Sequence, residues 1–244
     1  MFIPRILSNA SFSIANIGVQ ICGDEWTATP EYDALVDTEW KKMLIGAKHP
    51  IWDGTYYRVL NVAEMETGAA AGIMQLGIIR YRYIATFPAL HAEHSRCHLD
   101  PLYHLSTIAL IRTLDGHYLF GKRARNGQVD CIGGGVQRDE MVVSCGADIE
   151  RNLYKEMNEE IGIGNGDVVA ILGIGVLLSG TSNVLIVGHV RIGLSKADAA
   201  SRFDRRTENE MAELVFVPAD GLRAFLQSMD DYRNLIPNLL ENCV

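Results

Sequence analysis

Short runs of apolar and β-branched residues, separated by turn-forming Gly, Pro, Asn and Asp, recur along most of this chain. Runs of this kind are typical of strands. The pattern predicts strands over residues 14–21, 55–62, 73–86, 106–112, 117–122, 129–132, 168–178, 184–192 and 214–217. Apolar residues at helical intervals predict helices over residues 31–44 and 219–229. Strands that alternate with a few helices predict an α/β sandwich, with helices on both sides of a mixed sheet.

A further helix is predicted over the residues that precede Gly162. Leu153, Met157 and Ile161 follow one another at four-residue intervals and form an apolar stripe, which would pack the helix on a core. Gly162 can adopt the left-handed conformation that ends a helix. The segment that leads into this helix begins with the glycines at 133–135, directly after a predicted strand.

Three glutamates lie beside that stripe. Glu156, Glu159 and Glu160 are spaced i, i+3 and i+4, so their side chains would neighbour one another on a helix. Carboxylates this close repel by about 1 kcal/mol per pair in water, which a bound cation would relieve. Oxygen ligands without Cys or His favour Mg²⁺ or Mn²⁺ over zinc, and such an ion commonly bridges to phosphate. A solvated acidic helix face is the alternative interpretation.

The segment around these glutamates resembles the sequence box of the Nudix hydrolases. That box reads Gly, five residues, Glu, seven residues, and then Arg-Glu-apolar-any-Glu-Glu-any-Gly-apolar. Its second half is matched by Glu156, Met157, Glu159, Glu160, Gly162 and Ile163, and its first half by Gly134 and Glu140. The resemblance implies a Nudix-fold α/β/α sandwich, in which the box forms a loop, a helix and a second loop.

Two departures from the box stand out. Lys155 occupies the position of the arginine, and lysine keeps the charge but loses the planar fork of donors. Fourteen residues, and not seven, separate Glu140 from Lys155. This insertion leaves the role of Glu140 open.

The N-terminal part of the chain resembles one branch of the family, the UDP-glucose diphosphatases. The resemblance rests on PIWDGTYYR at 50–58, Leu76-Gly77, Tyr81-Arg82 and Thr86. That branch also has an interrupted box without the usual arginine. The likeness implies an N-terminal α+β extension over residues 1–100 and a Nudix hydrolase domain over residues 101–244.

A histidine-rich stretch lies at this predicted boundary. It contains His91, His94, Cys97, His98 and His104. The spacing matches no zinc template, so a histidine-rich loop that borders the active site is favoured over a metal site. Pro88 and Pro101 mark the stretch as a linker between the two parts.

The resemblance implies metal-dependent hydrolysis of the diphosphate in a nucleoside diphosphate linked to another group. The favoured substrate is a UDP-sugar, which would give UMP and a sugar 1-phosphate. The catalytic and metal-binding residues implied are Glu156, Glu159 and Glu160, with Mg²⁺ or Mn²⁺ as cofactor. ADP-ribose or another nucleotide-sugar is the alternative substrate. A Nudix fold that binds nucleotides with little or no catalysis is the alternative from another functional class.

The sequence leaves open which residues act as the general base and which contact the substrate. The general base would be a box glutamate or one of three late-loop glutamates, Glu208, Glu210 and Glu213, which the resemblance also allows as metal ligands. A solvated loop is the favoured interpretation of each late-loop glutamate. Arg58 and Arg82 are candidates for substrate contacts, because a guanidinium matches phosphate in a bidentate way. Ordinary arginines on a strand surface are the alternative interpretation of both.

The amino-acid composition limits the binding partners and the cellular location that we expect for this chain. The formal net charge of −8 argues against a nucleic-acid backbone as the main partner, and leaves a small nucleotide and a homodimer open. The longest apolar run, residues 168–178, is too short to span a bilayer, and residues 1–20 make a poor signal peptide. Five cysteines without a CxxC pair suggest neither a disulfide framework nor a zinc knuckle. A reducing cytoplasm fits best.

Overall fold

The computed structural model describes residues 3–47, 51–66, 72–93, 102–180 and 182–241. The strands in these ranges are β1 (Arg5–Ser8), β2 (Gly18–Glu25), β3 (Thr55–Val59), β4 (Ile73–Arg80), β5 (His104–Arg112), β6 (His117–Arg123), β7 (Val129–Asp130), β8 (Ile132–Gly135), β9 (Val168–Leu178), β10 (Asn183–Ile192) and β11 (Met211–Pro218). The helices are α1 (Pro30–Gly46), α2 (Val62–Glu66), α3 (Tyr81–Glu93), α4 (Gly146–Ile161), α5 (Lys196–Phe203), α6 (Leu222–Gln227) and α7 (Ile236–Leu240), with 3₁₀ turns η1 (Ile14–Asn16), η2 (Asn165–Asp167) and η3 (Tyr232–Leu235).

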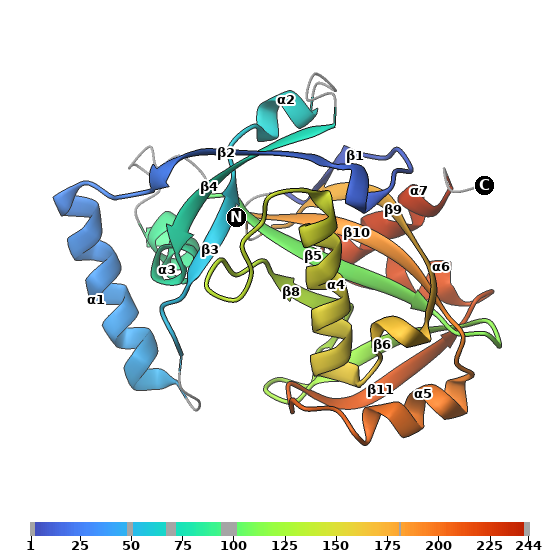
Figure 1. Ribbon diagram of the computed structural model, residues 1–244. Coiled ribbons are helices and arrows are strands. Elements are labelled where there is room, and N and C mark those ends of the chain that lie inside the picture. Colours follow the sequence, from blue (N-terminus) through green and yellow to red (C-terminus); the bar gives the residue numbers. More distant parts are fainter. Residues whose placement is uncertain (1–2, 48–50, 67–71, 94–101, 181, 242–244) are drawn as a thin grey trace.

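Within the described residues, eleven strands form one mixed sheet (Figure 1). Its main path runs β1-β9-β10-β5-β3-β4-β2. The strand β8 pairs with β5, and β6 pairs with β5, β7 and β11. The pairs β10–β5 and β2–β4 are parallel, and the other pairs are antiparallel. The central strand β5 therefore meets β10, β3, β6 and β8.

Side chains of β5 alternate between two cores, as a strand buried on both faces requires. Leu105, Ala109 and Ile111 join the hydrophobic cluster that contains the apolar stripe of α4. Ile108 and Leu110 join a second cluster with residues of α6 and α7. Helices thus cover both faces of the sheet, with α4 on one side and α6 and α7 on the other (Figure 1). The predicted α/β sandwich with a mixed sheet is confirmed.

Several predicted elements are confirmed with small shifts. The helix predicted over 31–44 is α1, and the strands predicted over 168–178 and 184–192 are β9 and β10. The strands over 106–112, 117–122 and 214–217 are β5, β6 and β11. The strand over 55–62 ends at Val59, because Val62 begins α2, and the helix over 219–229 shortens to α6. The strand over 129–132 divides into β7 and β8, and the strand over 14–21 is η1 followed by β2.

The strand predicted over 73–86 is wrong in its second half. The strand β4 ends at Arg80, and the helix α3 follows without a loop. Tyr83, Phe87 and Leu90 are buried against α1 at helical spacing, so tertiary packing overrides the β-propensity of these residues.

The stretch predicted as a linker is also partly helical. Pro88 lies inside α3, whose last turn contains His91, and His104 begins β5. The other residues named for this stretch, His94, Cys97, His98 and Pro101, lie outside the described residues.

The sheet runs through both predicted parts of the chain. The strand β3 pairs with β5 through Arg58 and His104, and β1 pairs with β9. Leu76 from the first part and Leu105 from the second belong to one hydrophobic cluster. The boundary near residue 100 stays a prediction. In the described part of the chain, no helix is long and apolar enough to cross a membrane.

Candidate active site

The helix α4 is fixed at both ends and along one face. At its start, the Asp148 carboxylate accepts the backbone N–H groups of Ser144 and Cys145, at 2.8 and 3.2 Å. At its end, Gly162 has a φ of 71° and donates its N–H to the carbonyl of Asn158. The apolar stripe is fully buried and consists of Ile149, Leu153, Met157 and Ile161. The predicted helix and its glycine stop are therefore confirmed. The helix that carries the glutamates is held in place by its caps and its buried face.

Two of the three helix glutamates lie directly against the glycine strand β8. A Cβ on Gly134 would come within 2.5 Å of the Glu156 carboxylate, so a larger residue there would displace that carboxylate. The backbone N–H of Gly133 donates to Glu160 Oε2 at 3.0 Å. Glu156 and Glu160 are 9% and 3% exposed. The glycines thus place two carboxylates against bare backbone.

Lys155 gathers three carboxylates. Its Nζ lies 2.7 Å from Glu140 Oε2, 2.9 Å from Glu159 Oε2 and 3.3 Å from Glu156 Oε1. The fourteen residues between Glu140 and Lys155 therefore return Glu140 to the helix, although they are twice the number in the Nudix box. Lysine reaches all three groups as a point charge, without the planar fork of an arginine.

The late loop reaches the same place. The backbone N–H of Glu208 donates to the carbonyl of Glu159 at 3.2 Å, which ties the loop to the end of α4. Glu210 lies 3.1 Å from Arg123 Nη1, and the same nitrogen lies 3.9 Å from Glu160. Glu213 instead pairs with Lys122 and points away into solvent. The structure thus brings Glu208 and Glu210, but not Glu213, to the helix glutamates.

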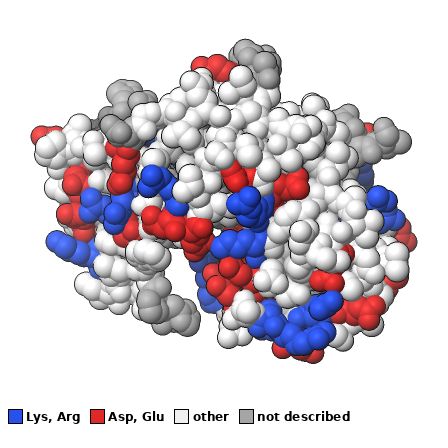
Figure 2. Space-filling view, in the orientation of Figure 1, with Lys and Arg blue, Asp and Glu red and all other residues white. Residues whose placement is uncertain are grey.

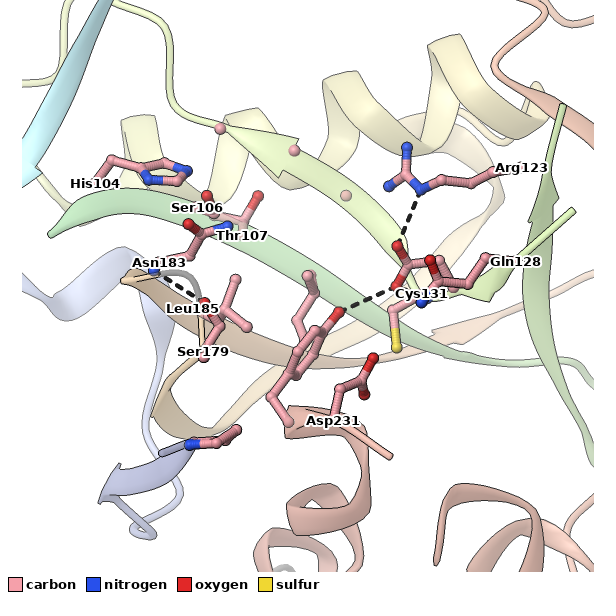
Figure 3. Close-up of a pocket in the computed structure, with 18 of the residues that line it drawn as sticks. His104, Ser106, Thr107, Arg123, Gln128, Cys131, Ser179, Asn183, Leu185 and Asp231 are labelled. Atoms are coloured by element: carbon pink, nitrogen blue, oxygen red, sulfur yellow. Dashed lines mark hydrogen bonds and ion pairs between the residues drawn. The ribbon is translucent and has the colours of Figure 1, made fainter. Parts of the chain in front are cut away.

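Arg123 was not singled out in the sequence, yet it is the second cation of the site. Its Nε lies 2.9 Å from Asp130, which also accepts a hydrogen bond from the Tyr232 hydroxyl (Figure 3). Arg123 comes from the end of β6 and Asp130 from β7. In the sequence, Arg123 directly follows one predicted strand and Asp130 lies in the next, a pairing that is common on ordinary surfaces.

Carboxyl groups outnumber the two cations of this site. Burial raises the pKa of Glu156 to about 7 and that of Glu160 to about 8, against the lowering effect of Lys155 and Arg123 respectively. Without a further cation, both groups are therefore partly or largely protonated near pH 7, and a bound Mg²⁺ or Mn²⁺ would replace that proton. The type of donor atom thus suits such an ion. Among the described residues no three acidic, His or Cys side chains converge as a metal site needs, and Lys155 lies between three of the carboxylates.

A cavity of about 650 Å³ lies beside the glycine strand (Figure 3). Polar groups dominate its labelled lining, among them His104, Ser106, Gln128 and Asn183. Burial lowers the pKa of His104 to about 4, so its ring is neutral near pH 7. The Nδ1 atom of this ring is buried and has no hydrogen-bond partner among the described residues. The cavity thus offers neutral polar groups to a ligand.

A second cavity, of about 630 Å³, adjoins the first. It reaches Glu140 and Glu210, and it lies in the notch between the α1 side and the β6–β11 side, where acidic and basic side chains gather (Figure 2). The two cavities share Tyr56, Tyr81, Arg123 and Arg125. The two arginines therefore stand at the junction of the cavities.

The two arginines predicted to contact substrate lie elsewhere. Arg82 pairs with Asp33 at 3.1 Å and Asp37 at 2.8 Å, both on α1. Arg58 lies over the Trp26 ring, 5.7 Å from its centroid, and partial burial lowers its pKa. The described residues that line the two cavities include neither arginine. Their role in substrate binding stays a prediction.

No family model and no curated protein matches this chain. Several solved structures are similar in fold. Tm1382, a putative Nudix hydrolase, has 14% identity and a TM-score of 0.45, covering 84% of this chain and 97% of that one. The MutT protein from Methanosarcina mazei Go1 has 21% identity and a TM-score of 0.42, covering 59% and 98%. The Nudix domain of Shewanella oneidensis NrtR, solved with ADP-ribose, has 14% identity and a TM-score of 0.37, covering 62% and 95%. Likenesses this weak carry no argument about what this chain does.

Proposed function

We propose that this chain is a Nudix hydrolase that splits the diphosphate of a nucleoside diphosphate linked to another group. The substrate proposed is a UDP-sugar, and the products are UMP and a sugar 1-phosphate. One observation carries the proposal: Glu156 and Glu160 lie buried against the backbone of β8, with Glu159 and Glu140 gathered beside them. Buried carboxylates with raised pKa values are typical of functional sites, and these two pack against the glycine strand that lines the first cavity.

The helix glutamates Glu156, Glu159 and Glu160 would hold Mg²⁺ or Mn²⁺. Such an ion, when bound, neutralises charge on phosphate oxygens and lowers the pKa of an attacking water. Arg123 and Arg125, at the junction of the cavities, would bind the diphosphate through their guanidinium groups.

Glu208 is the late-loop residue best suited to accept a proton from water. Partial burial and the neighbouring Glu159 raise its pKa, which moves a carboxylate towards the range of an effective general base. Glu210 is held by Arg123, so it is already engaged in an ion pair.

The polar cavity supports a sugar as the second group. His104, Ser106 and Asn183 present neutral donors and acceptors, which suit hydroxyl groups better than a further phosphate. We also propose residues 1–100 as an extension that supplies β1 to β4 to the sheet. The thiols of Cys22, Cys131 and Cys145 are free, which supports a reducing cytoplasm as the location.

A panel of substrates tests the proposal. Product release is measured from UDP-glucose and ADP-ribose, each with and without Mg²⁺. We expect Mg²⁺-dependent release of UMP, faster from UDP-glucose than from ADP-ribose. Preference for ADP-ribose would keep the chemistry and replace the substrate. Failure on both compounds would overturn the proposed hydrolysis.

A nucleotide-binding module without catalysis is the second candidate. The observation that favours it is the place of Lys155 between three carboxylates, where its ammonium group already supplies a cation. Nucleotide binding by calorimetry, with no product from any compound of the panel, would support this candidate.

A further inference from the structure

The second cavity has an aromatic wall that the proposed chemistry does not use. Trp52 lines this cavity, and its side chain is 68% exposed. Tyr56 and Tyr81 line it too, with ring centroids 5.3 Å apart. Glu140 and Glu210 lie in the same lining. An aromatic surface and the acidic cluster therefore face one cavity.

Exposure alone does not distinguish Trp52. Ile45 is 87% exposed, yet it is not among the residues that line either cavity. Single exposed apolar side chains of that kind are ordinary. A large aromatic side chain left open in a concave site, beside convergent charged groups, is what ligand sites commonly show.

The aromatic wall begins at the glutamates. Burial, and then the neighbouring Tyr81 hydroxyl and the carboxylates of Glu140 and Glu156, raise the pKa of Tyr56, so these groups lie close to its ring. Tyr56 also lines the polar cavity that contains His104. A ligand whose diphosphate lies at Arg123 and Arg125 would thus extend one end into the polar cavity and the other along the aromatic wall.

We propose that Trp52 stacks on the base of the nucleoside diphosphate and makes the site selective for ligands that carry a flat aromatic ring. The placement of the diphosphate rests on the proposed function. Stacking tolerates any base, because every base has a π-face. Trp52 therefore selects for the presence of a base, and the polar cavity takes the other group.

The test compares binding of UDP and of inorganic diphosphate, which has no base, by calorimetry on the full chain. The variants are Trp52→Leu and Trp52→Phe, with Ile45→Ala as a matched exposed control. We expect Trp52→Leu to weaken UDP binding about tenfold, the size of one base–aromatic stack, and to leave inorganic diphosphate unchanged. Trp52→Phe should restore most of the affinity, and Ile45→Ala should behave as wild type.

A fluorescence measurement supplies an independent readout. UDP should quench the tryptophan emission of the wild type, and Trp52→Leu should lose that quenching although Trp26 and Trp40 remain. Unchanged UDP affinity in Trp52→Leu would overturn the inference. Equal weakening of UDP and inorganic diphosphate would also overturn it. A third contrary outcome is a Trp52→Leu variant whose oligomeric state differs from that of the wild type while its UDP affinity is unchanged. Trp52 would then belong to an interface between copies of the chain.

Failure of this inference is distinguishable from failure of the proposed function. If the wild type hydrolyses UDP-glucose and Trp52→Leu keeps the wild-type KM, the inference falls and the function stands. If the wild type hydrolyses nothing while Trp52→Leu selectively loses UDP binding, the function falls and the inference stands.

Discussion

Two clusters in this protein look alike at first sight, since in each a cation meets several carboxylates. Arg82 meets Asp33 and Asp37 on α1, and Arg80 beside it meets Asp53. Lys155 meets Glu140, Glu156 and Glu159. Both clusters join segments that are distant in the sequence.

The clusters differ in charge balance and burial. Around Arg82, two arginines face three aspartates, and the side chains of Asp33 and Asp37 are 40% and 47% exposed. Around Lys155 and Arg123, two cations face five glutamates, and Glu160 is 3% exposed. A nearly balanced, exposed cluster is typical of structural ion pairs, whereas a cluster with an excess of carboxyl groups, two of them buried, needs a further cation or a proton. The presence of ion pairs therefore does not separate a structural cluster from a functional one. The number of carboxyl groups relative to cations does.

The largest effect is expected from Glu160→Gln. We expect turnover to fall by at least about a hundredfold, because the variant removes a carboxylate of the proposed catalytic set. The unfolding temperature should not fall, because burial raises the pKa of Glu160 and a neutral amide avoids that cost. Initial rates and thermal unfolding measure the two outcomes.

The matched control for that variant is Glu213→Gln, in the exposed pair with Lys122. It should keep the wild-type rate. A fully active Glu160→Gln variant would contradict a catalytic role for the cluster around Lys155 and Arg123.

Lys155→Ala should have the next largest effect. We expect a loss of turnover of about tenfold, the size found for residues that orient metal ligands, because Glu156 and Glu159 lose their common partner. Mg²⁺ titration by calorimetry separates two roles. Weaker Mg²⁺ binding would make Lys155 an orienting residue, and tighter binding with unchanged turnover would contradict that role.

Arg82→Ala should act on stability alone. The variant removes three ion pairs, with Asp33, Asp37 and Asp53, and a hydrogen bond to the Tyr83 hydroxyl, which should lower the free energy of unfolding by about 1–2 kcal/mol. Urea unfolding measures this change, and we expect kcat and KM to stay at wild-type values. A raised KM would place Arg82 in contact with substrate, as the sequence predicts, and would remove the contrast between the two clusters.

The smallest effect is expected from the pH dependence of His104. Its pKa in the folded protein is lowered to about 4, below its value in the unfolded chain, so the unfolded chain binds more protons as the pH falls. The free energy of unfolding should therefore decrease by about 1 kcal/mol between pH ~7.5 and pH ~6 through this group. His104→Gln should remove that part of the pH dependence. Identical pH profiles for wild type and His104→Gln would contradict the burial of a neutral imidazole in the cavity beside the glycine strand.

Local patterns were enough to predict the helix that carries the glutamates. The apolar stripe of Leu153, Met157 and Ile161 and the stop at Gly162 depend on residues within one segment, and the structure has the same helix. The strands β9 and β10 were equally clear, because their apolar runs are long and bounded by turn residues. These features depend on short-range physics.

The remaining features depend on contacts between distant segments. Nothing near residues 81–86 distinguishes a strand from α3, since only packing against α1 favours the helix. Arg123, Asp130 and the polar cavity around His104 arise where β5 to β8 meet. The catalytic roles of Glu156, Glu159 and Glu160 are still predictions, which the variants above test.

The insertion between Glu140 and Lys155 also bears on the thermodynamics of chain closure. Residues 146–154 belong to α4, so only residues 141–145 form the loop between Glu140 and the helix. Loop length enters the closure entropy weakly, since each doubling of a flexible loop adds only about 0.6 kcal/mol. The ion pair between the two side chains, at 2.7 Å, can offset a cost of that size. The linear spacing of such a motif is therefore free to drift while its ends stay together in space. A sequence pattern with a fixed spacing therefore fails to match chains in which the two ends of the motif meet in space at a different spacing.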